Sequence, residues 1–264
     1  MRLSLAFSPC PNDTFIFDAM VHHKIDTEGL EFEVRLEDVE TLNNQAMRGM
    51  MQVSKVSYHA FLYLGNTYVL LDSGSALGKG NGPLLIARAD FPPEQMNGLT
   101  IAVPGEYTTA HMLLRFAFPG LKLKRFMIFS AIEQAILDGT VDAGVIIHEN
   151  RFTYQKKGLI KIADLGELWE AQTHLPIPLG GIVAKRSLGY EVIARLNRVM
   201  YKSVRFAMEH PQDAMDYVRA NAQEMEEEVM EKHIRLYVND YTLNLGEDGK
   251  KAVQKLFSLQ NPPD

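Results

Sequence analysis

Several residue types that would point to particular classes of protein are scarce in this chain of 264 residues. Cys10 is the only cysteine, which excludes an intrachain disulfide. No apolar run approaches the roughly 20 residues that a membrane-spanning helix requires. Acidic residues outnumber basic ones by 33 to 27, and the resulting net charge of −6 argues against nucleic acid as a partner. We therefore expect neither a nucleic-acid-binding protein nor a membrane protein.

Motifs for metal and phosphate binding are missing as well. The eight histidines are scattered, and residues 148–152 lack the second histidine of the zinc-protease helix motif. Residues 78–82 resemble a phosphate loop only loosely, because the Gly-Lys-Ser/Thr ending is absent and a strand-like segment follows. We expect no metal site, and we interpret the glycine-rich stretch 73–83 as a mobile loop over a cleft.

The amino terminus superficially resembles a lipoprotein leader, since a short apolar stretch ends near Cys10. That stretch is far too short for the core of a signal peptide, and a proline follows the cysteine. We interpret residues 3–7 as a first strand, and we expect a cytoplasmic protein.

What the chain does have is a regular alternation of strand-like and helix-like segments. Expected strands cover residues 3–7, 30–36, 53–57, 68–71, 84–88, 99–103, 124–129, 141–147 and 180–185. Expected helices cover residues 14–21, 40–50, 109–116, 131–137, 190–209, 211–220, 225–238 and 248–259. This alternation predicts an α/β fold in which mostly parallel sheets are flanked by helices, followed by a helical carboxyl-terminal part.

The order of these segments also predicts two lobes. Composition changes at residues 90–93, where an Asp-Phe-Pro-Pro stretch follows a strand-like segment. We place a second lobe at residues 89–184, inserted between the two halves of a first lobe, residues 1–88 and 185–264. The two crossings of the chain would form a hinge, with the substrate cleft between the lobes.

The most informative segment is 134–149, which reads as a helix end, a glycine stop, a short apolar strand and a His-Glu pair. A weaker copy at 45–58 places Tyr58 opposite His148. Because ligands in open α/β sheets bind beyond the carboxyl ends of strands, His148 is expected at the cleft, where it can accept a proton. A structural, hydrogen-bonded histidine is the alternative. Glu149 either orients His148 or faces solvent.

Two further segments follow expected strands of the first lobe. Asn12 and Asp13 open the first helix, where they would cap it and its N–H groups could meet an anion; a capped turn around a buried Cys10 is the alternative. Lys55 and Ser57 lie on one face of their strand and could hold a carboxylate or a hydroxyl. An exposed lysine and a helix cap form the alternative there.

A third segment opens the first helix of the second lobe. Thr108 or Thr109 is a suitable cap, and the N–H groups of Thr109 and Ala110 would then point outward from the helix end. Such a helix terminus can cradle a negatively charged oxygen. A simple cap without a ligand is the alternative.

These segments together carry a specific resemblance, which covers most of residues 1–186. The motifs that carry it are Ser8–Phe15, Asp38–Asn43, Lys55–Ser57, Gly74–Gly78, Gly82–Leu85 and the stretch from His148 to Tyr154. In these motifs the chain resembles the 1,4-dihydroxy-6-naphthoate synthases of the futalosine route to menaquinone.

The resemblance implies a fold like that of the type II periplasmic solute-binding proteins, used as a cytoplasmic enzyme. It implies a lyase that converts cyclic dehypoxanthinyl futalosine to 1,4-dihydroxy-6-naphthoate without a metal or an organic cofactor. His148 matches the proposed proton acceptor of the family. The family's substrate-binding residues match Lys55, Val56, Ser57, Thr109 and Ala110.

The expected partner is thus an anionic, sugar-derived small molecule; a homodimer is compatible with the sequence. Three alternatives stay open. Chorismate dehydratase of the same pathway shares the fold, but the Ser8–Phe15 motif and the His-Glu pair favour the synthase. A non-catalytic solute-binding protein should carry an export signal, and a ligand-sensing regulator should carry a DNA-binding segment.

Overall fold

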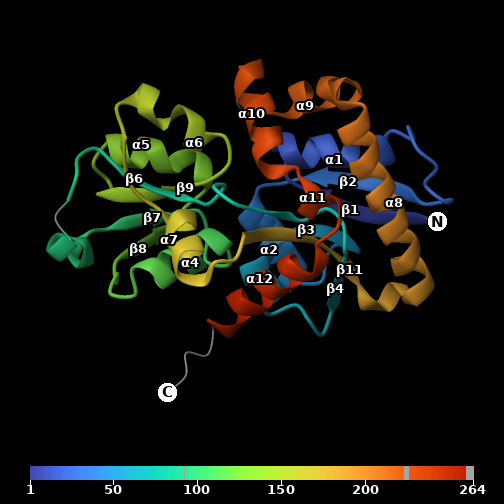
Figure 1. Ribbon diagram of the computed structural model, residues 1–264, viewed down its shortest axis with the longest axis horizontal. Helices are drawn as coiled ribbons and strands as arrows, with labels where there is room; N and C mark the ends of the chain where they lie inside the picture. The colour runs from blue at the N-terminus through green and yellow to red at the C-terminus, as the bar shows by residue number, and fades with distance from the viewer. Residues whose placement is uncertain (92, 223–225, 260–264) are drawn as a thin grey trace.

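The computed structural model describes residues 1–91, 93–222 and 226–259. The chain folds into two lobes that lie side by side (Figure 1). Each lobe is built on its own sheet, and the chain passes between the two sheets twice. Within the described residues, no helix is both long enough and apolar enough to span a bilayer.

The first sheet has the strand order β2-β1-β3-β11-β4, with β5 attached to β11. Its strands are β1 (Arg2–Phe7), β2 (Glu31–Leu36), β3 (Val53–Ser57), β4 (Tyr68–Leu70), β5 (Ala76–Gly78) and β11 (Ile177–Lys185). β1 runs parallel to β2 and β3, whereas β11 runs antiparallel to β3, β4 and β5. The sheet is therefore mixed.

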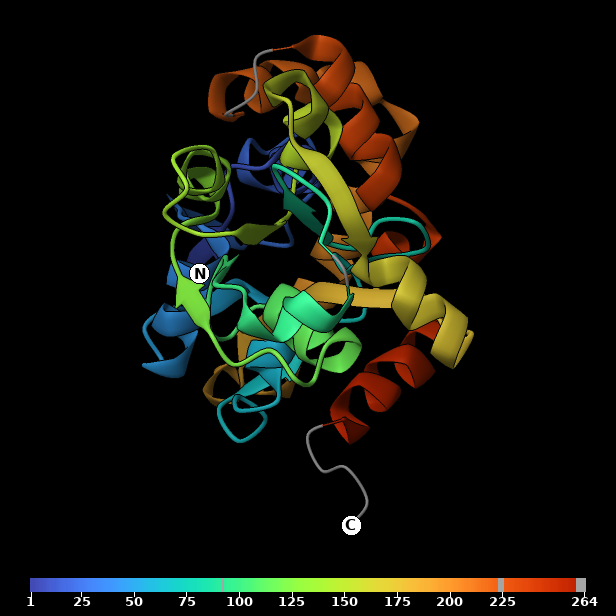
Figure 2. The same cartoon turned by 90° about the vertical axis from the view of Figure 1, so that its left-hand side faces the viewer.

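Helices cover both faces of the first sheet. They are α1 (Pro11–Val21), α2 (Val39–Met47), α3 (Tyr58–Phe61), α8 (Tyr190–Glu209), α9 (Met215–Asn221), α10 (Glu227–Tyr237), α11 (Asp240–Leu243) and α12 (Gly246–Ser258). α1 packs against α8, α9 and α10, whereas α2 packs against β1 and β3. Figures 1 and 2 show α9 and α10 at one end of the molecule and α12 at the other, where it contacts β11 and α3.

The second sheet has the strand order β10-β6-β9-β7-β8. Its strands are β6 (Leu84–Ala87), β7 (Ile101–Val103), β8 (Lys124–Phe126), β9 (Ala143–Ile146) and β10 (Ile160–Asp164), and its helices are α4 (Thr109–Ala117), α5 (Ile132–Leu137), α6 (Asn150–Thr153) and α7 (Leu165–Thr173). β7 is parallel to β8 and β9, whereas β6 is antiparallel to β9 and β10. Short 3₁₀ segments, η1 (Pro93–Gly98), η2 (Phe129–Ala131), η3 (Tyr154–Lys157), η4 (Arg186–Leu188) and η5 (Pro211–Ala214), connect these elements.

The apolar strands explain why both sheets are covered on both faces. Side chains alternate across a strand, so a continuous apolar run needs a partner on each side. In β6, Leu85 and Ala87 join the core that contains Trp169 of α7, whereas Leu84 and Ile86 join the core on the side of α5. Because both faces of each sheet are buried under other elements, it is mainly the ends of the strands that can contribute residues to a site.

The expected α/β fold with two lobes is confirmed, but one detail of the expectation was wrong. Both sheets are mixed rather than mostly parallel, because β11, β6 and β10 run against their neighbours. Sheet membership also differs from the expected lobes 1–88 plus 185–264 and 89–184 by one strand at each crossing. β6 lies in the second sheet, and β11 pairs with β3 in the first. Strand partners depend on the whole chain and not on local sequence.

Part of the glycine-rich stretch 73–83 belongs to the first sheet, because β5 pairs with β11 and is buried. The residues on either side of β5 are irregular, and Lys79 and Gly80 are exposed. The sequence pattern also missed β10, the helix α7 and the short helices α3, α6 and α11. The segment expected as one helix at 211–220 begins as the 3₁₀ segment η5 before α9. The expected helix 225–238 corresponds to α10, and its first residue, Met225, lies outside the described residues.

Candidate active site

A cavity with about 680 Å³ of empty volume, partly open to solvent, lies between the two lobes. Its walls come from the end of β1 and the start of α1, from β3, from the start of α4, from the turn after β9, and from α10. Eight of the nine residues that the sequence pointed to line it: Asn12, Asp13, Lys55, Val56, Ser57, Thr109, Ala110 and His148. The ninth, Glu149, is buried directly beside His148.

Asp13 is the anchor of the first-lobe wall. Its carboxylate accepts hydrogen bonds from Ser8 Oγ at 2.7 Å, from Asn12 Nδ2 at 2.9 Å and from Lys55 Nζ at 2.9 Å. The expectation that Asn12 or Asp13 caps the helix was wrong: α1 begins at Pro11, and Cys10 occupies the cap position without a side-chain cap bond. Proline is favoured at the first helical position because its missing N–H needs no partner there. The helix therefore starts before Asn12 and Asp13, whose side chains line the cavity.

Lys55 reaches the cavity from β3 as expected, but its ammonium group is already paired. The period of two along β3 turns Val53 and Lys55 toward the α1 face, where Lys55 meets Asp13. Both side chains are nearly buried, with 8% and 3% exposed. A bound anion would therefore meet a cation whose charge the neighbouring carboxylate largely balances.

Ser57 ends β3 and is held from α2. Its backbone N–H donates to Asn43 Oδ1 at 2.9 Å, and Asn43 Nδ2 donates to Ser57 Oγ at 3.1 Å. Asn43 also donates to Glu40, whose other oxygen accepts from the backbone N–H of Tyr107 in the second lobe at 3.2 Å. Burial raises the pKa of Glu40. Gly105 permits this contact, because a Cβ there would lie 2.3 Å from the Glu40 carboxyl carbon.

The start of α4 supplies the opposite wall. Thr108 is its cap residue, and Thr108 Oγ accepts from the backbone N–H of His111 at 3.2 Å. The Thr109 hydroxyl donates to the carbonyl of Leu179 at 2.7 Å. Because the first N–H groups of a helix have no intrahelical acceptor, the backbone of Thr109 and Ala110 presents donors to the cavity.

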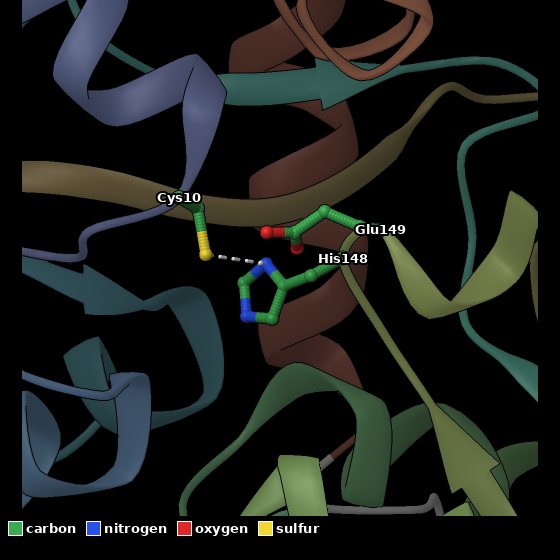
Figure 3. A group of neighbouring side chains, drawn as sticks. All are labelled: Cys10, His148 and Glu149. Atoms are coloured by element: carbon green, nitrogen blue, oxygen red, sulfur yellow. Dashed lines mark hydrogen bonds between the residues drawn. The ribbon is translucent and has the colours of Figure 1, made fainter. Parts of the chain in front are cut away.

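His148 follows β9 in a left-handed conformation, with φ of 59°. Nδ1 lies 3.3 Å from Cys10 Sγ, so the two lobes meet at this contact (Figure 3). The rings of Phe129 and His148 pack in an edge-type arrangement, with their centroids 4.9 Å apart. Nε2 is buried and has no hydrogen-bond partner among the described residues. Burial lowers the pKa of His148 to about 4, so the ring is neutral at neutral pH.

Glu149 does not face solvent, which removes one of the two readings that the sequence left open; its side chain points toward Cys10 and His148 (Figure 3). Ligand atoms of these three residues lie within 4.8 Å of one another, and thiolate, imidazole and carboxylate are all groups that zinc accepts. Burial and the nearby Glu149 charge raise the pKa of the Cys10 thiol well above its ordinary value. A metal ion would therefore have to displace the thiol proton before Cys10 could bind it.

The sequence pattern gave no role to several polar residues of the cavity, among them His233, Tyr237 and Asn81. His233 and Tyr237 come from α10, one helical turn apart, and Asn81 follows β5. His233 Nε2 lies 2.8 Å from Asn12 Oδ1. Both polar atoms of the Asn81 amide are buried without a partner among the described residues. For His233 and Tyr237, the only signal in the sequence was a polar residue on the apolar face of a helix. Such a signal does not predict that His233 bonds to Asn12, 221 positions away.

The chain matches the model of a family described as menaquinone biosynthesis over residues 3–261. It is 46% identical over 256 residues to 1,4-dihydroxy-6-naphthoate synthase from Thermus thermophilus, which covers 97% of this chain and 93% of that protein. It is 45% identical over 262 residues to the enzyme of the same name from Streptomyces coelicolor, with 97% and 92% covered.

Two solved structures superpose on the chain over most of its length. A protein from Archaeoglobus fulgidus superposes with a TM-score of 0.92 at 38% identity, covering 98% of this chain and 96% of that one. A Candida albicans protein described as having the generic periplasmic-binding-protein fold superposes with a TM-score of 0.70 at 14% identity, covering 100% and 92%. The second likeness establishes the fold alone. Through its sequence relatives, the chain belongs to the menaquinone-biosynthesis family that includes the 1,4-dihydroxy-6-naphthoate synthases.

Proposed function

We propose that the protein is a cofactor-independent carbon–carbon lyase that converts cyclic dehypoxanthinyl futalosine to 1,4-dihydroxy-6-naphthoate, with His148 as the proton acceptor. The names of the two synthases support the overall reaction. The observation that carries the role of His148 is its neutral imidazole at the cavity, with a buried Nε2 that bonds to no described protein group.

The reaction requires a base, because breaking up the sugar-derived ring and aromatising the remainder removes protons. Burial keeps the imidazole of His148 neutral at neutral pH, so one of its two ring nitrogens can accept a proton. Nε2 is that nitrogen in the tautomer whose Nδ1–H donates to Cys10 Sγ. A low pKa also makes a weak base. A bound anion would offset this, because a nearby negative charge raises the pKa, as Asp13 already does.

The reaction also places negative charge on oxygen as carbon bonds break. The backbone N–H groups at the start of α4 and the hydroxyl of Ser57 line the same cavity and can donate to such an oxygen. Since Asp13 balances the charge of Lys55, the neutral donors contribute most to stabilising the negatively charged oxygen that forms during the reaction. Thr109 and Ala110 act here through the backbone.

Contacts between the lobes enclose the reacting groups. Besides Cys10 and His148, Glu40 accepts from Tyr107, and Lys156 donates to Glu226 at 2.6 Å. A closed cavity keeps water away from reactive intermediates and strengthens hydrogen bonds to developing charge. In this proposal the substrate enters while the lobes are apart and reacts while these contacts are made.

The test is turnover of cyclic dehypoxanthinyl futalosine, followed by mass spectrometry, in wild type and His148→Asn. Asparagine tolerates the left-handed backbone but is no base. We expect a loss of about 10²–10⁴-fold in kcat with near-normal substrate binding. His174→Asn is a matched control, because exposed His174 has nearly the same φ of 57°.

Near-normal turnover by the His148→Asn variant would remove His148 from the mechanism. Wild type that leaves this substrate intact but dehydrates chorismate would instead identify the sister enzyme.

A further inference from the structure

His233 occupies a position in the cavity that the proposed mechanism does not use. It belongs to α10, a helix that stands beside the junction of the two lobes (Figure 1), and the residue is only 1% exposed. Its ring stacks near that of His148, with centroids 6.3 Å apart and planes inclined by 21°. Both rings line the same cavity. A substrate bound in this cavity can therefore meet His233 as well as the proposed base.

A chain of hydrogen bonds fixes the tautomer of His233. Lys55 can only donate and the Asp13 carboxylate accepts; Asn12 Nδ2 also donates to Asp13, at 2.9 Å. This leaves Asn12 Oδ1, which can only accept, facing Nε2 of His233 at 2.8 Å. Nε2 must therefore carry the hydrogen. Burial lowers the pKa of His233 well below its ordinary value, so the ring is neutral and Nδ1 holds a lone pair.

That lone pair has no hydrogen-bond partner among the described residues, although Nδ1 is buried. A buried acceptor without a donor is unfavourable, and a ligand that supplies the donor removes the cost. We propose that Nδ1 of His233 accepts a hydrogen bond from a hydroxyl group of the substrate. The identity of that donor rests on the proposed function, in which the substrate is sugar-derived.

Two substitutions separate this role from a structural one. In His233→Gln, the terminal amide reaches the position of Nε2 and can still donate to Asn12, but no acceptor remains at Nδ1. In His233→Asn, the amide oxygen lies near the position of Nδ1 and can accept, but the link to Asn12 is lost. A purely structural role thus favours the glutamine variant, and a substrate contact favours the asparagine variant.

The experiment measures kcat/KM for cyclic dehypoxanthinyl futalosine and, by calorimetry, the affinity for 1,4-dihydroxy-6-naphthoate, which carries ring hydroxyls. We expect a loss of at least about tenfold in both for His233→Gln, and less than about threefold for His233→Asn. Thermal unfolding of both variants checks the fold. Equal losses, or a larger loss in the asparagine variant, would overturn the inference. Wild type without turnover would refute the proposed function instead, and the affinities would still decide the role of His233.

Discussion

Replacing Lys55 by methionine should destabilise the fold strongly while weakening substrate binding only modestly. Lys55 Nζ lies 2.9 Å from Asp13 Oδ1, and both side chains are nearly buried. Removing one partner of a buried ion pair leaves an uncompensated charge and costs about 3–5 kcal/mol. Asp13 keeps its hydrogen bonds from Ser8 and Asn12, which places the expected loss near the lower end, about 3 kcal/mol. The melting temperature should fall by about 6–12 °C.

The assay is a double-mutant cycle on the free energy of unfolding, with Lys55→Met, Asp13→Asn and the double variant. The double variant should recover much of the loss, because it contains no buried charge. Lys156→Met is the matched control: its pair with Glu226 is 58% and 56% exposed, so removing it should cost at most about 1 kcal/mol.

Substrate binding distinguishes the two roles of Lys55. Because Asp13 balances the charge of Lys55, KM should rise by less than about tenfold in Lys55→Met. A tenfold rise would correspond to a loss of about 1.4 kcal/mol in the free energy of binding. A KM raised a hundredfold in a variant that unfolds like wild type would refute this reasoning. It would show that the ammonium group is directed at the substrate carboxylate rather than at Asp13.

Three further predictions follow from the same geometry. Burial lowers the pKa values of His59 and His148 to about 4, below their ordinary value of about 6.5. Each group should therefore reduce the free energy of unfolding by about 3 kcal/mol as the pH falls from 6.5 to 4. Urea unfolding measured against pH should show a smaller decrease in His148→Asn than in wild type. Gly105→Ala should lower kcat/KM at least about tenfold by displacing Glu40, whereas Gly65→Ala, with open space around it, should not. Dialysis against a chelator should leave turnover unchanged, and a loss restored by zinc would contradict the cofactor-free proposal.

The sequence predicted those parts of the structure that depend on neighbours along the chain. The strand at 53–57 matches β3, and the apolar strand before His148 does end at the cavity. The cap at Thr108 was also predictable, because it depends on one local hydrogen bond. The cap at Asn12 or Asp13 was not, since an adjacent proline moved the helix start to Pro11.

The contacts that define the site depend on distant partners, and no local pattern encodes them. Cys10 meets His148 across 138 positions, and Asn12 meets His233 across 221. A histidine on the apolar face of a helix is ordinarily a core residue. Only the juxtaposition with Asn12, which the sequence alone does not provide, shows which ring nitrogen of His233 is left for a ligand.

The fold by itself does not separate an enzyme from a solute receptor, because structures at 14% identity share it. The charges at the cavity favour the enzyme. A receptor for an anion gains affinity from a cation that faces its ligand, but Asp13 balances Lys55 here. The cavity offers instead two histidines that burial keeps neutral, each with a buried nitrogen that bonds to no described residue. Such nitrogens contribute little to holding a carboxylate, but they suit a substrate whose O–H and C–H groups must be oriented and deprotonated.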